Sequence, residues 1–249
     1  MADPEVPGDL VRLWRLRAGP RLGRPAELDV DRVVNKAVEL ADGGGVSAAS
    51  LPKIAAALKV TPMSLYRHIG SKDELTILMA DAAQGPPPVD LDPAAGWRAA
   101  LRRWAEAHRA VCLRHPWLAQ LPISGPPRGP NAIGWMDAGL GALRDTGLNW
   151  PSLLGVIFLL DSFVRQSVAA TQQLEDHRSA AHLDESQALR AYRAELSPLV
   201  DPARFPHAAA LFASGLFDAV PQPETSGDEE FTFGLDLILD GVAAQLPRP

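Results

Sequence analysis

Residues 50–75, SLPKIAAALKVTPMSLYRHIGSKDEL, contain two short helical patterns separated by a turn of a few residues. The first pattern has the i, i+3, i+4, i+7 spacing of an amphipathic helix, carried by Leu51, Ile54, Ala55 and Leu58. Ser50 or Ser47 is its expected N-cap. The second helix is predicted to begin at Pro62 and to last about two turns, because Thr61 is a favourable N-cap and proline suits the first helical position.

One further helix is predicted on each side of this pair. Upstream, apolar residues recur with helical spacing over about residues 29–42, and three glycines at 43–45 then stop the pattern. Downstream, Ser71 and Glu74 have the S-x-x-E spacing of a capping box, which predicts a fourth helix to about residue 83. Four consecutive helices, the middle two joined by a tight turn, are typical of a helix-turn-helix.

The rest of the chain is also predicted to be helical. Helical patterns cover about residues 93–114, 129–146, 150–177, 185–196, 205–218 and 228–246, and proline-rich segments separate them. No segment has the pattern of a strand. The sequence therefore predicts an all-α fold, with a small N-terminal helical unit followed by a larger helical domain.

A helix-turn-helix reads DNA when its second helix enters the major groove, which is about 12 Å wide, while the first helix braces it. The apolar residues expected to pack the two helices together are Leu51, Ile54, Leu58, Val60, Leu65 and Ile69. The side chains left facing outward are those of Thr61, Pro62, Met63, Ser64, Tyr66, Arg67 and His68. These mostly polar or basic residues suit contact with base edges and phosphates.

The charge distribution supports a polyanionic partner at the N-terminal end. The whole chain has a net charge of −6, but residues 1–72 hold 11 Lys and Arg against 8 Asp and Glu, a net charge of +3. Residues 43–72 carry four basic residues and no acidic residue. A locally basic stretch over the helix-turn-helix is the expected electrostatic footprint of a DNA-binding surface.

The segment 50–75 resembles the DNA-binding signature of the TetR family of bacterial transcriptional regulators. Residues at the family's spacing are Ile54, Ala55, Leu58, Val60, Leu65, Tyr66, His68, Ser71, Lys72 and Leu75. The resemblance covers residues 25–82 well and beyond them only the layout of helices. It implies a helix-turn-helix DNA-binding domain at 25–72 and a helical ligand-binding and dimerisation domain at 73–249, after a basic extension at 1–24.

The resemblance also implies roles for individual residues. Pro62, Met63 and Ser64 stand where the family meets base edges, and Arg67 is expected to join them. The positions that resemble the family's phosphate contacts are Tyr66, His68, Lys72 and, from the start of the preceding helix, Ser50 or Leu51. One departure lies in the turn, where the residue before Val60 is commonly glycine in the family and is Lys59 here. If that position requires a left-handed backbone, lysine costs about 1 kcal/mol.

Five arginines precede the first predicted helix, and they form a candidate minor-groove arm: Arg12, Arg15, Arg17, Arg21 and Arg24. Flexible arginine arms can enter the minor groove beside a helix-turn-helix. A disordered, solvated tail is the alternative. Apolar residues at 10, 13, 14 and 16 instead favour a short helix that docks on another part of the protein.

Two helices of the larger domain are broadly apolar. The helix near 150–177 is apolar on most faces, and the helix near 228–246 has a wide apolar face, so both must be covered on more than one side. In the TetR family these two helices from each subunit form a four-helix dimer interface. A homodimer would place two recognition helices on half-sites about 34–36 Å apart, so a near-palindromic operator is expected.

Aromatic and charged residues of the larger domain are the candidate contacts to a small-molecule effector: Trp104, His108, Trp117, Trp135, Met136, Phe158, Asp161 and Arg165. They lie on helices that usually surround the family's ligand pocket, and core packing is the alternative for each. Asp161 and Arg165 are one helical turn apart in an apolar helix, so they are expected to be paired, most simply with each other.

The sequence argues against an enzyme, because it has no glycine-rich phosphate loop, no G-x-S-x-G and no H-E-x-x-H. No cofactor or metal is expected. The single cysteine, Cys112, excludes an internal disulfide, and no apolar run reaches the length of a membrane span, so a cytoplasmic, nucleoid-associated protein is expected. The alternative to a ligand-responsive repressor is a DNA-binding regulator controlled by a protein partner, or an activator.

Overall fold

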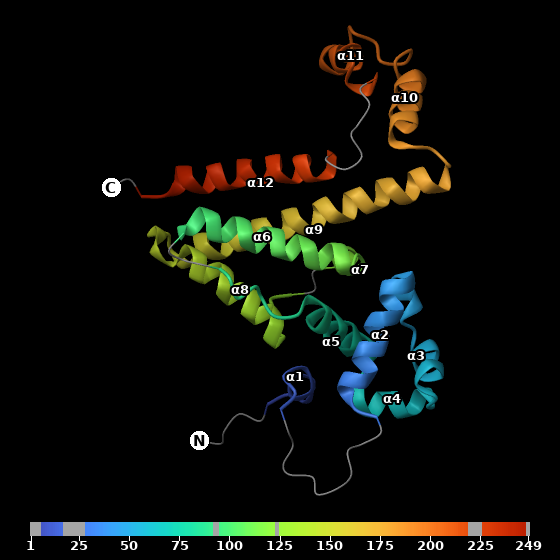
Figure 1. The fold of residues 1–249 in the computed structure, drawn as a ribbon, viewed down its shortest axis with the longest axis vertical. Helices are drawn as coiled ribbons and strands as arrows, with labels where there is room; N and C mark the ends of the chain where they lie inside the picture. The colour runs from blue at the N-terminus through green and yellow to red at the C-terminus, as the bar shows by residue number, and fades with distance from the viewer. Residues whose placement is uncertain (1–5, 17–27, 92–94, 123–124, 219–225, 248–249) are drawn as a thin grey trace, which may run out of the picture. The chain divides into compact units, whose positions relative to one another are not determined.

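Helices make up the regular structure of this protein. The computed structural model describes residues 6–16, 28–91, 95–122, 125–218 and 226–247, and these ranges contain helices and no strand (Figure 1). The all-α prediction is confirmed over this part of the chain.

The chain divides into two compact units. Unit 1 consists of residues 1–168 and 237–249, and unit 2 consists of residues 169–236. The domain boundary predicted at residue 72 lies inside unit 1. Polar contacts described below join the segments on either side of that boundary.

The N-terminal part of unit 1 holds the helix-turn-helix, which we call the head. It consists of α2 (Val30–Gly44), α3 (Leu51–Leu58) and α4 (Pro62–Ile69), with a short 3-10 turn at Val46–Ala48. Three of its side chains, Ile54, Leu65 and Ile69, are fully buried, as are Val33 and Val34 of α2, which packs on both α3 and α4. α5 (Lys72–Gln84) follows at once and packs on α2, so it leads from the head to the rest of unit 1 (Figure 1).

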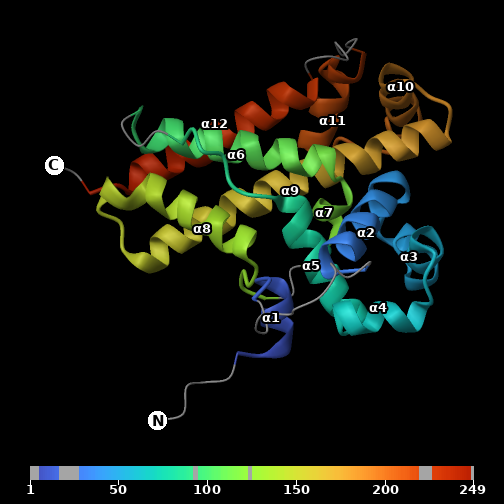
Figure 2. The same cartoon turned by 60° about the horizontal axis from the view of Figure 1, so that its bottom comes forward.

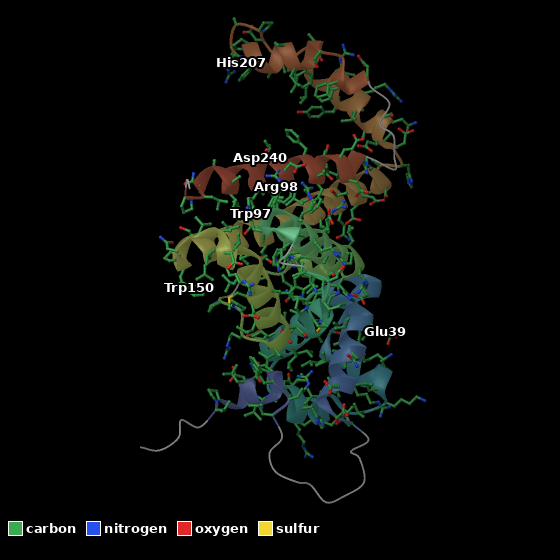
Figure 3. The ribbon with its side chains drawn as sticks, turned by 60° about the vertical axis from the view of Figure 1, so that its left-hand side comes forward. Glu39, Trp97, Arg98, Trp150, His207 and Asp240 are labelled. Atoms are coloured by element: carbon green, nitrogen blue, oxygen red, sulfur yellow. The ribbon has the colours of Figure 1, made fainter. Side chains whose placement is uncertain are left out.

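The remainder of unit 1, which we call the body, is a helical bundle. It contains α6 (Trp97–Arg114), α7 (Trp117–Gln120), α8 (Pro130–Leu143), a 3-10 turn at Arg144–Thr146, the first part of α9 (Trp150–Ala180) and the end of α12 (Ser226–Gln245). α8 passes close to α9, because a Cβ placed on Gly139 would lie 2.6 Å from Cδ1 of Ile157. Arg98 on α6 and Asp240 on α12 form an ion pair of 2.7 Å, and Figure 3 labels both residues.

Unit 2 contains three packed aromatic rings, one each from α10 (Glu185–Leu196), α11 (Pro206–Ala213) and a 3-10 turn at Leu216–Asp218. The rings of Tyr192 and Phe212 stack at 5.7 Å, and Phe217 lies 5.0 Å from Phe212. The sequence predicted one helix over 205–218. The structure breaks it at Gly215, whose φ of 80° lies in the left-handed region.

Two helices differ from the predictions for physical reasons. α6 begins at Trp97 rather than near 93, after Gly96 with φ of 87°, and residues 92–94 lie outside the described ranges. α9 extends to Ala180 and is, among the described helices, the one long and apolar enough by composition to cross a membrane. One such helix is weak grounds for a membrane span, because α9 also buries Leu160 and Val164 within the protein.

Candidate nucleic-acid interface

The turn between α3 and α4 contains a left-handed residue at the position where the TetR family commonly has glycine. Lys59 has φ of 58° and ψ of 40°, a left-handed conformation that ends α3. The amides of Lys59 and Val60 bond back to the carbonyls of Ala56 and Ala55, so the last turn of α3 is closed. Lysine therefore occupies a position that glycine would adopt without strain.

α4 starts where its sequence predicts. The Thr61 hydroxyl accepts a hydrogen bond from the Ser64 amide at 3.3 Å, Pro62 takes the first helical position, and Gly70 ends the helix. Only Leu65 and Ile69 of this helix are buried. They anchor α4 on the head, which leaves the rest of its surface available to a partner.

The predicted base-reading residues lie on that free surface. Met63 is 73% exposed, Thr61, Pro62 and Arg67 are exposed, and Ser64 is half-buried, with its hydroxyl donating to the Thr61 carbonyl. An exposed thioether at the start of a short helix can pack against a thymine methyl group. Thr61 to Ser64 thus lie together at the start of α4, and Arg67 lies in its last turn.

The predicted phosphate contacts surround the same helix. Tyr66 is 44% exposed, His68 is half-buried, and Lys72 is exposed in the first turn of α5. Ser50 is the N-cap residue of α3, and its side chain makes no capping hydrogen bond, which leaves the hydroxyl free to meet a phosphate. Contact of these four residues with the DNA backbone remains a prediction.

Half of the predicted capping box at the start of α5 forms. The Ser71 hydroxyl accepts from the Glu74 amide at 3.1 Å. The Glu74 carboxylate instead accepts two hydrogen bonds from the Arg12 guanidinium, and the Ser71 amide bonds to the Ile69 carbonyl. A charge-assisted pair with arginine is stronger than the neutral bond that the box would supply, so Arg12 captures the glutamate.

Arg12 and Arg15 are not arranged as a free minor-groove arm. Arg12 lies in a short helix, α1 (Gly8–Leu13), and Arg15 lies two residues after the end of that helix. Arg12 bonds Glu74, and Arg15 Nε bonds Asp31 at 2.6 Å. The structure therefore favours the docked helix over the arm for these two residues. Arg17, Arg21 and Arg24 lie outside the described residues.

Three of the predicted effector residues meet in the core of the body. The rings of Trp104, His108 and Trp135 lie 5.3–5.6 Å apart, and all three are 2–3% exposed. Trp104 Nε1 donates to the Trp135 carbonyl at 2.9 Å, and Trp135 Nε1 donates to the Gly85 carbonyl at 2.9 Å. We call these three residues the aromatic cluster.

His108 is the polar member of the aromatic cluster. Its buried Nδ1 has no hydrogen-bond partner among the described residues and lies 3.6 Å from Asp161 Oδ1. Burial lowers the pKa of His108 below its ordinary value of 6.5, against the opposing effect of the Asp161 charge. Burial therefore favours the neutral imidazole, and its Nδ1 is left without a hydrogen bond beside Asp161.

The other predicted effector residues do not join the aromatic cluster. Asp161 lies beside His108, while Arg165 donates to the Leu121 carbonyl at 2.6 Å, so the expected pairing of Asp161 with Arg165 is replaced by separate partners. Trp117 donates to Asp42 in the head at 2.7 Å. Met136 is half-buried on α8, and Phe158 is 60% exposed on the outer face of α9.

Two acidic residues with structural roles were missed by the sequence analysis. Asp42, at the end of α2, accepts from Trp117 and lies 2.8 Å from Nδ1 of His115. Asp81 of α5 accepts from the Ala132 amide at 3.0 Å and from the Asn131 side chain at 3.2 Å, and so caps the start of α8. Burial raises the pKa of Asp81, partly offset by these bonds. The sequence did offer a signal for Asp81, because this acidic residue lies among the apolar positions of the predicted fourth helix.

Comparisons with known proteins agree with this arrangement. Residues 33–78 match the family model "Bacterial regulatory proteins, tetR family", and residues 89–246 match "Tetracyclin repressor-like, C-terminal domain". The chain is 35% identical over 243 residues to the HTH-type transcriptional repressor DrrR1 of Streptomyces coeruleorubidus, covering 94% of this chain and 86% of that protein. It is 27% identical to the Escherichia coli tetracycline repressor protein class E, covering 89% and 93%.

Solved structures show the same fold. ActR of Streptomyces coelicolor in complex with (S)-DNPA superposes with a TM-score of 0.69 at 27% identity, covering 88% of this chain and 98% of ActR. ActR in complex with actinorhodin gives 0.68 at 26% identity, covering 87% and 97%. From the helix-turn-helix, the helical body and these matches, the chain belongs to the TetR family of bacterial transcriptional regulators.

Proposed function

We propose that this protein is a dimeric repressor that binds a near-palindromic operator and is released by a small, largely apolar or aromatic molecule. The observation that carries the proposal is α4, which buries only Leu65 and Ile69 and leaves its N-terminal side chains exposed. The name of DrrR1, a repressor, supports repression. The effector would be an antibiotic or another natural product, and the regulated gene one for export or biosynthesis.

Dimerisation is supported by an apolar groove on unit 1. The groove has a volume of about 700 Å³ and lies between the start of α9 and the end of α12. Leu159 and Leu237 line it and are 50% and 56% exposed, and Leu154 and Phe158 add further exposed apolar surface on α9. Gly155 and Gly241 lower the walls of the groove, so a helix of a second copy can approach closely. Such a patch on a soluble regulator favours association.

An effector site in the body is supported by the aromatic cluster. An aromatic ligand could stack on Trp104 or Trp135 and satisfy the unused Nδ1 of His108, which offers either a donor or an acceptor. Asp161 Oδ1 lies 3.6 Å from this nitrogen, and Arg165 follows one turn later on α9. The ActR complexes with actinorhodin and (S)-DNPA support an effector of this chemical class. Trp117 and Phe158 are less suited, because they lie apart from the cluster.

Release would be a population shift, in which the effector prefers a conformation whose two heads are wrongly spaced for the operator. α5 is the expected lever. Its first turn follows the reading helix directly, and Asp81 near its end holds the start of α8, which also carries Trp135. A ligand that moved Trp135 would therefore act on the helix that orients the head.

Footprinting tests the proposal. The full chain is incubated with the DNA upstream of its own gene, and protection is mapped with and without planar aromatic natural products. We expect two protected half-sites about one helical turn apart, and loss of protection with at least one compound. Protection that no compound relieves would contradict the effector part, and an absence of sequence-specific protection would contradict operator binding.

A further inference from the structure

Helix α1 lies beside α5 and the N-terminal end of α8 (Figure 2). On one side, Arg15 pairs with Asp31 in the first turn of α2, and Arg12 pairs with Glu74 in the first turn of α5, directly after the head. The Leu13 side chain is 5% exposed, so the helix is docked through an apolar contact as well. The N-terminal segment is therefore attached to both helices that flank the DNA-reading pair.

The body side of α1 is held by the segment before α8. Asp9 Oδ2 lies 2.6 Å from Nη2 of Arg128, and Trp14 Nε1 donates to the Arg128 carbonyl at 2.8 Å. This double contact fixes the backbone at 128 as well as its side chain. The hydrogen bond from Arg128 holds the pKa of Asp9 below its ordinary value, as expected for a formed pair.

The same segment is where α5 meets α8. A Cβ on Gly129 would lie 2.0 Å from the Asp81 carboxylate, and Asp81 bonds the amide of Ala132. α5 is thus held near its start by Arg12 and near its end by the start of α8, and α1 spans the two places. A change in the position of α8 would reach the head by two routes, through α5 and through α1.

We propose that α1 is a brace that sets the position of the reading head on the body, and that Asp9, Arg12 and Trp14 are positioning residues for operator recognition. The alternative hypothesis is that the N-terminal arginines form an arm that enters the minor groove. The two hypotheses predict opposite effects of D9R on operator affinity. Added positive charge strengthens DNA binding by an arm, whereas the same change weakens a brace because the contact with Arg128 is lost. The inference rests on operator binding by a dimer, as proposed above.

The test reverses one ion pair and then restores it. The full chain selects its operator from random duplexes, and affinity is measured for that operator and for the same duplex with one base pair inserted between the half-sites. For D9R and for R128D we expect roughly three- to tenfold weaker operator binding, in line with partly exposed pairs that act together. We also expect both to discriminate less against the inserted base pair, because an unbraced head can adapt its position.

The exchanged variant D9R/R128D should recover most of the affinity and of the discrimination, which a general loss of stability would not do. Arg103→Asp is the matched control, since Arg103 pairs with Asp90 at 2.9 Å in the body and is, like Arg128, 45% exposed. It should leave both quantities unchanged. Trp14→Phe removes only the indole donor and should show the same pattern at about two- to threefold.

Three results would overturn the brace. D9R could bind the operator more tightly with no recovery in the exchanged variant, which is the behaviour of a DNA arm. D9R, R128D and Trp14→Phe could all match the wild type in affinity and discrimination. The affinity could fall equally for both duplexes, so that discrimination stays intact. If the wild-type chain selects no duplex, the proposed function fails, and this outcome is distinct from all three.

Discussion

The head and the body place their proposed functional residues in opposite ways. In the head, Met63 and Tyr66 are exposed on a helix that is held by two buried neighbours. In the body, Trp104, His108 and Trp135 are themselves the core. A surface that meets DNA can be changed without loss of fold, whereas a site inside a core combines recognition with stability.

The largest expected effect on operator affinity comes from disrupting the proposed dimer, which leaves the head itself unchanged. Leu159→Asp or Leu237→Asp places a charge in the groove between α9 and α12 and should yield monomers that still fold. Operator affinity should fall by about 100-fold or more, because one head alone loses the effective concentration supplied by its partner. Light scattering and operator titration measure the two effects.

Leu113→Asp is the control for this prediction, since Leu113 is 50% exposed on α6 and does not line the groove. It should remain dimeric. Dimers of Leu159→Asp that bind DNA normally would contradict the interface.

The next effect is confined to the head. Tyr66→Ala and Lys72→Ala should each weaken DNA binding about tenfold for every sequence, because both are placed to meet phosphates. Lys72→Ala should also reduce the slope of log affinity against log salt by about 1. Met63→Ala should instead change the preferred bases. Equal thermal unfolding of all three and the wild type checks that the fold is unaffected.

We expect the stability of the body to depend on pH through His108. Its pKa is lowered by burial, so above the ordinary value of 6.5 the neutral form is present in both states and the stabilisation is complete. As the pH falls below 6.5, the unfolded chain takes up a proton that the folded core resists, and the free energy of unfolding decreases. His108→Phe should remove this part of the decrease between about pH 7.5 and about pH 5.5.

Denaturant titrations at several pH values measure this dependence. His207→Gln changes an exposed histidine and should leave it as in the wild type. A decrease of the same size in His108→Phe and the wild type would contradict a neutral, buried imidazole.

The smallest effect concerns the turn of the head. Lys59→Gly should raise the free energy of unfolding by up to about 1 kcal/mol, because glycine adopts φ of 58° without strain. Ala56→Gly, in the exposed interior of α3, should lower it by about 1 kcal/mol. Thermal unfolding of both variants compares the positions directly. Destabilisation by both would show that the turn is not strained by lysine.

Local chemistry made the head predictable from the sequence. Thr61, Pro62 and Ser71 act within a few residues of their position in the chain, so the starts of α4 and α5 followed from caps alone. The left-handed backbone at Lys59 was only raised as a condition, from the glycine that the resembling family commonly has there.

The contacts between distant segments were not predictable in this way. Arg12 meets Glu74 62 residues further along the chain, and Trp117 meets Asp42 75 residues before it. No local rule pairs such residues. Spacing alone also could not separate Trp117 and Phe158 from the tryptophans that form the aromatic cluster, since all lie on helices with apolar faces. Their separation depends on how the helices pack in three dimensions.

The central claim is that the exposed end of α4 and the start of α5 recognise the operator. A full chain carrying Met63→Ala, Ser64→Ala, Tyr66→Ala and Lys72→Ala, with wild-type thermal unfolding and dimerisation, is titrated against the selected operator and against an unrelated duplex. We expect its affinity for the operator to fall to that for the unrelated duplex. Operator affinity equal to that of the wild type would contradict the claim.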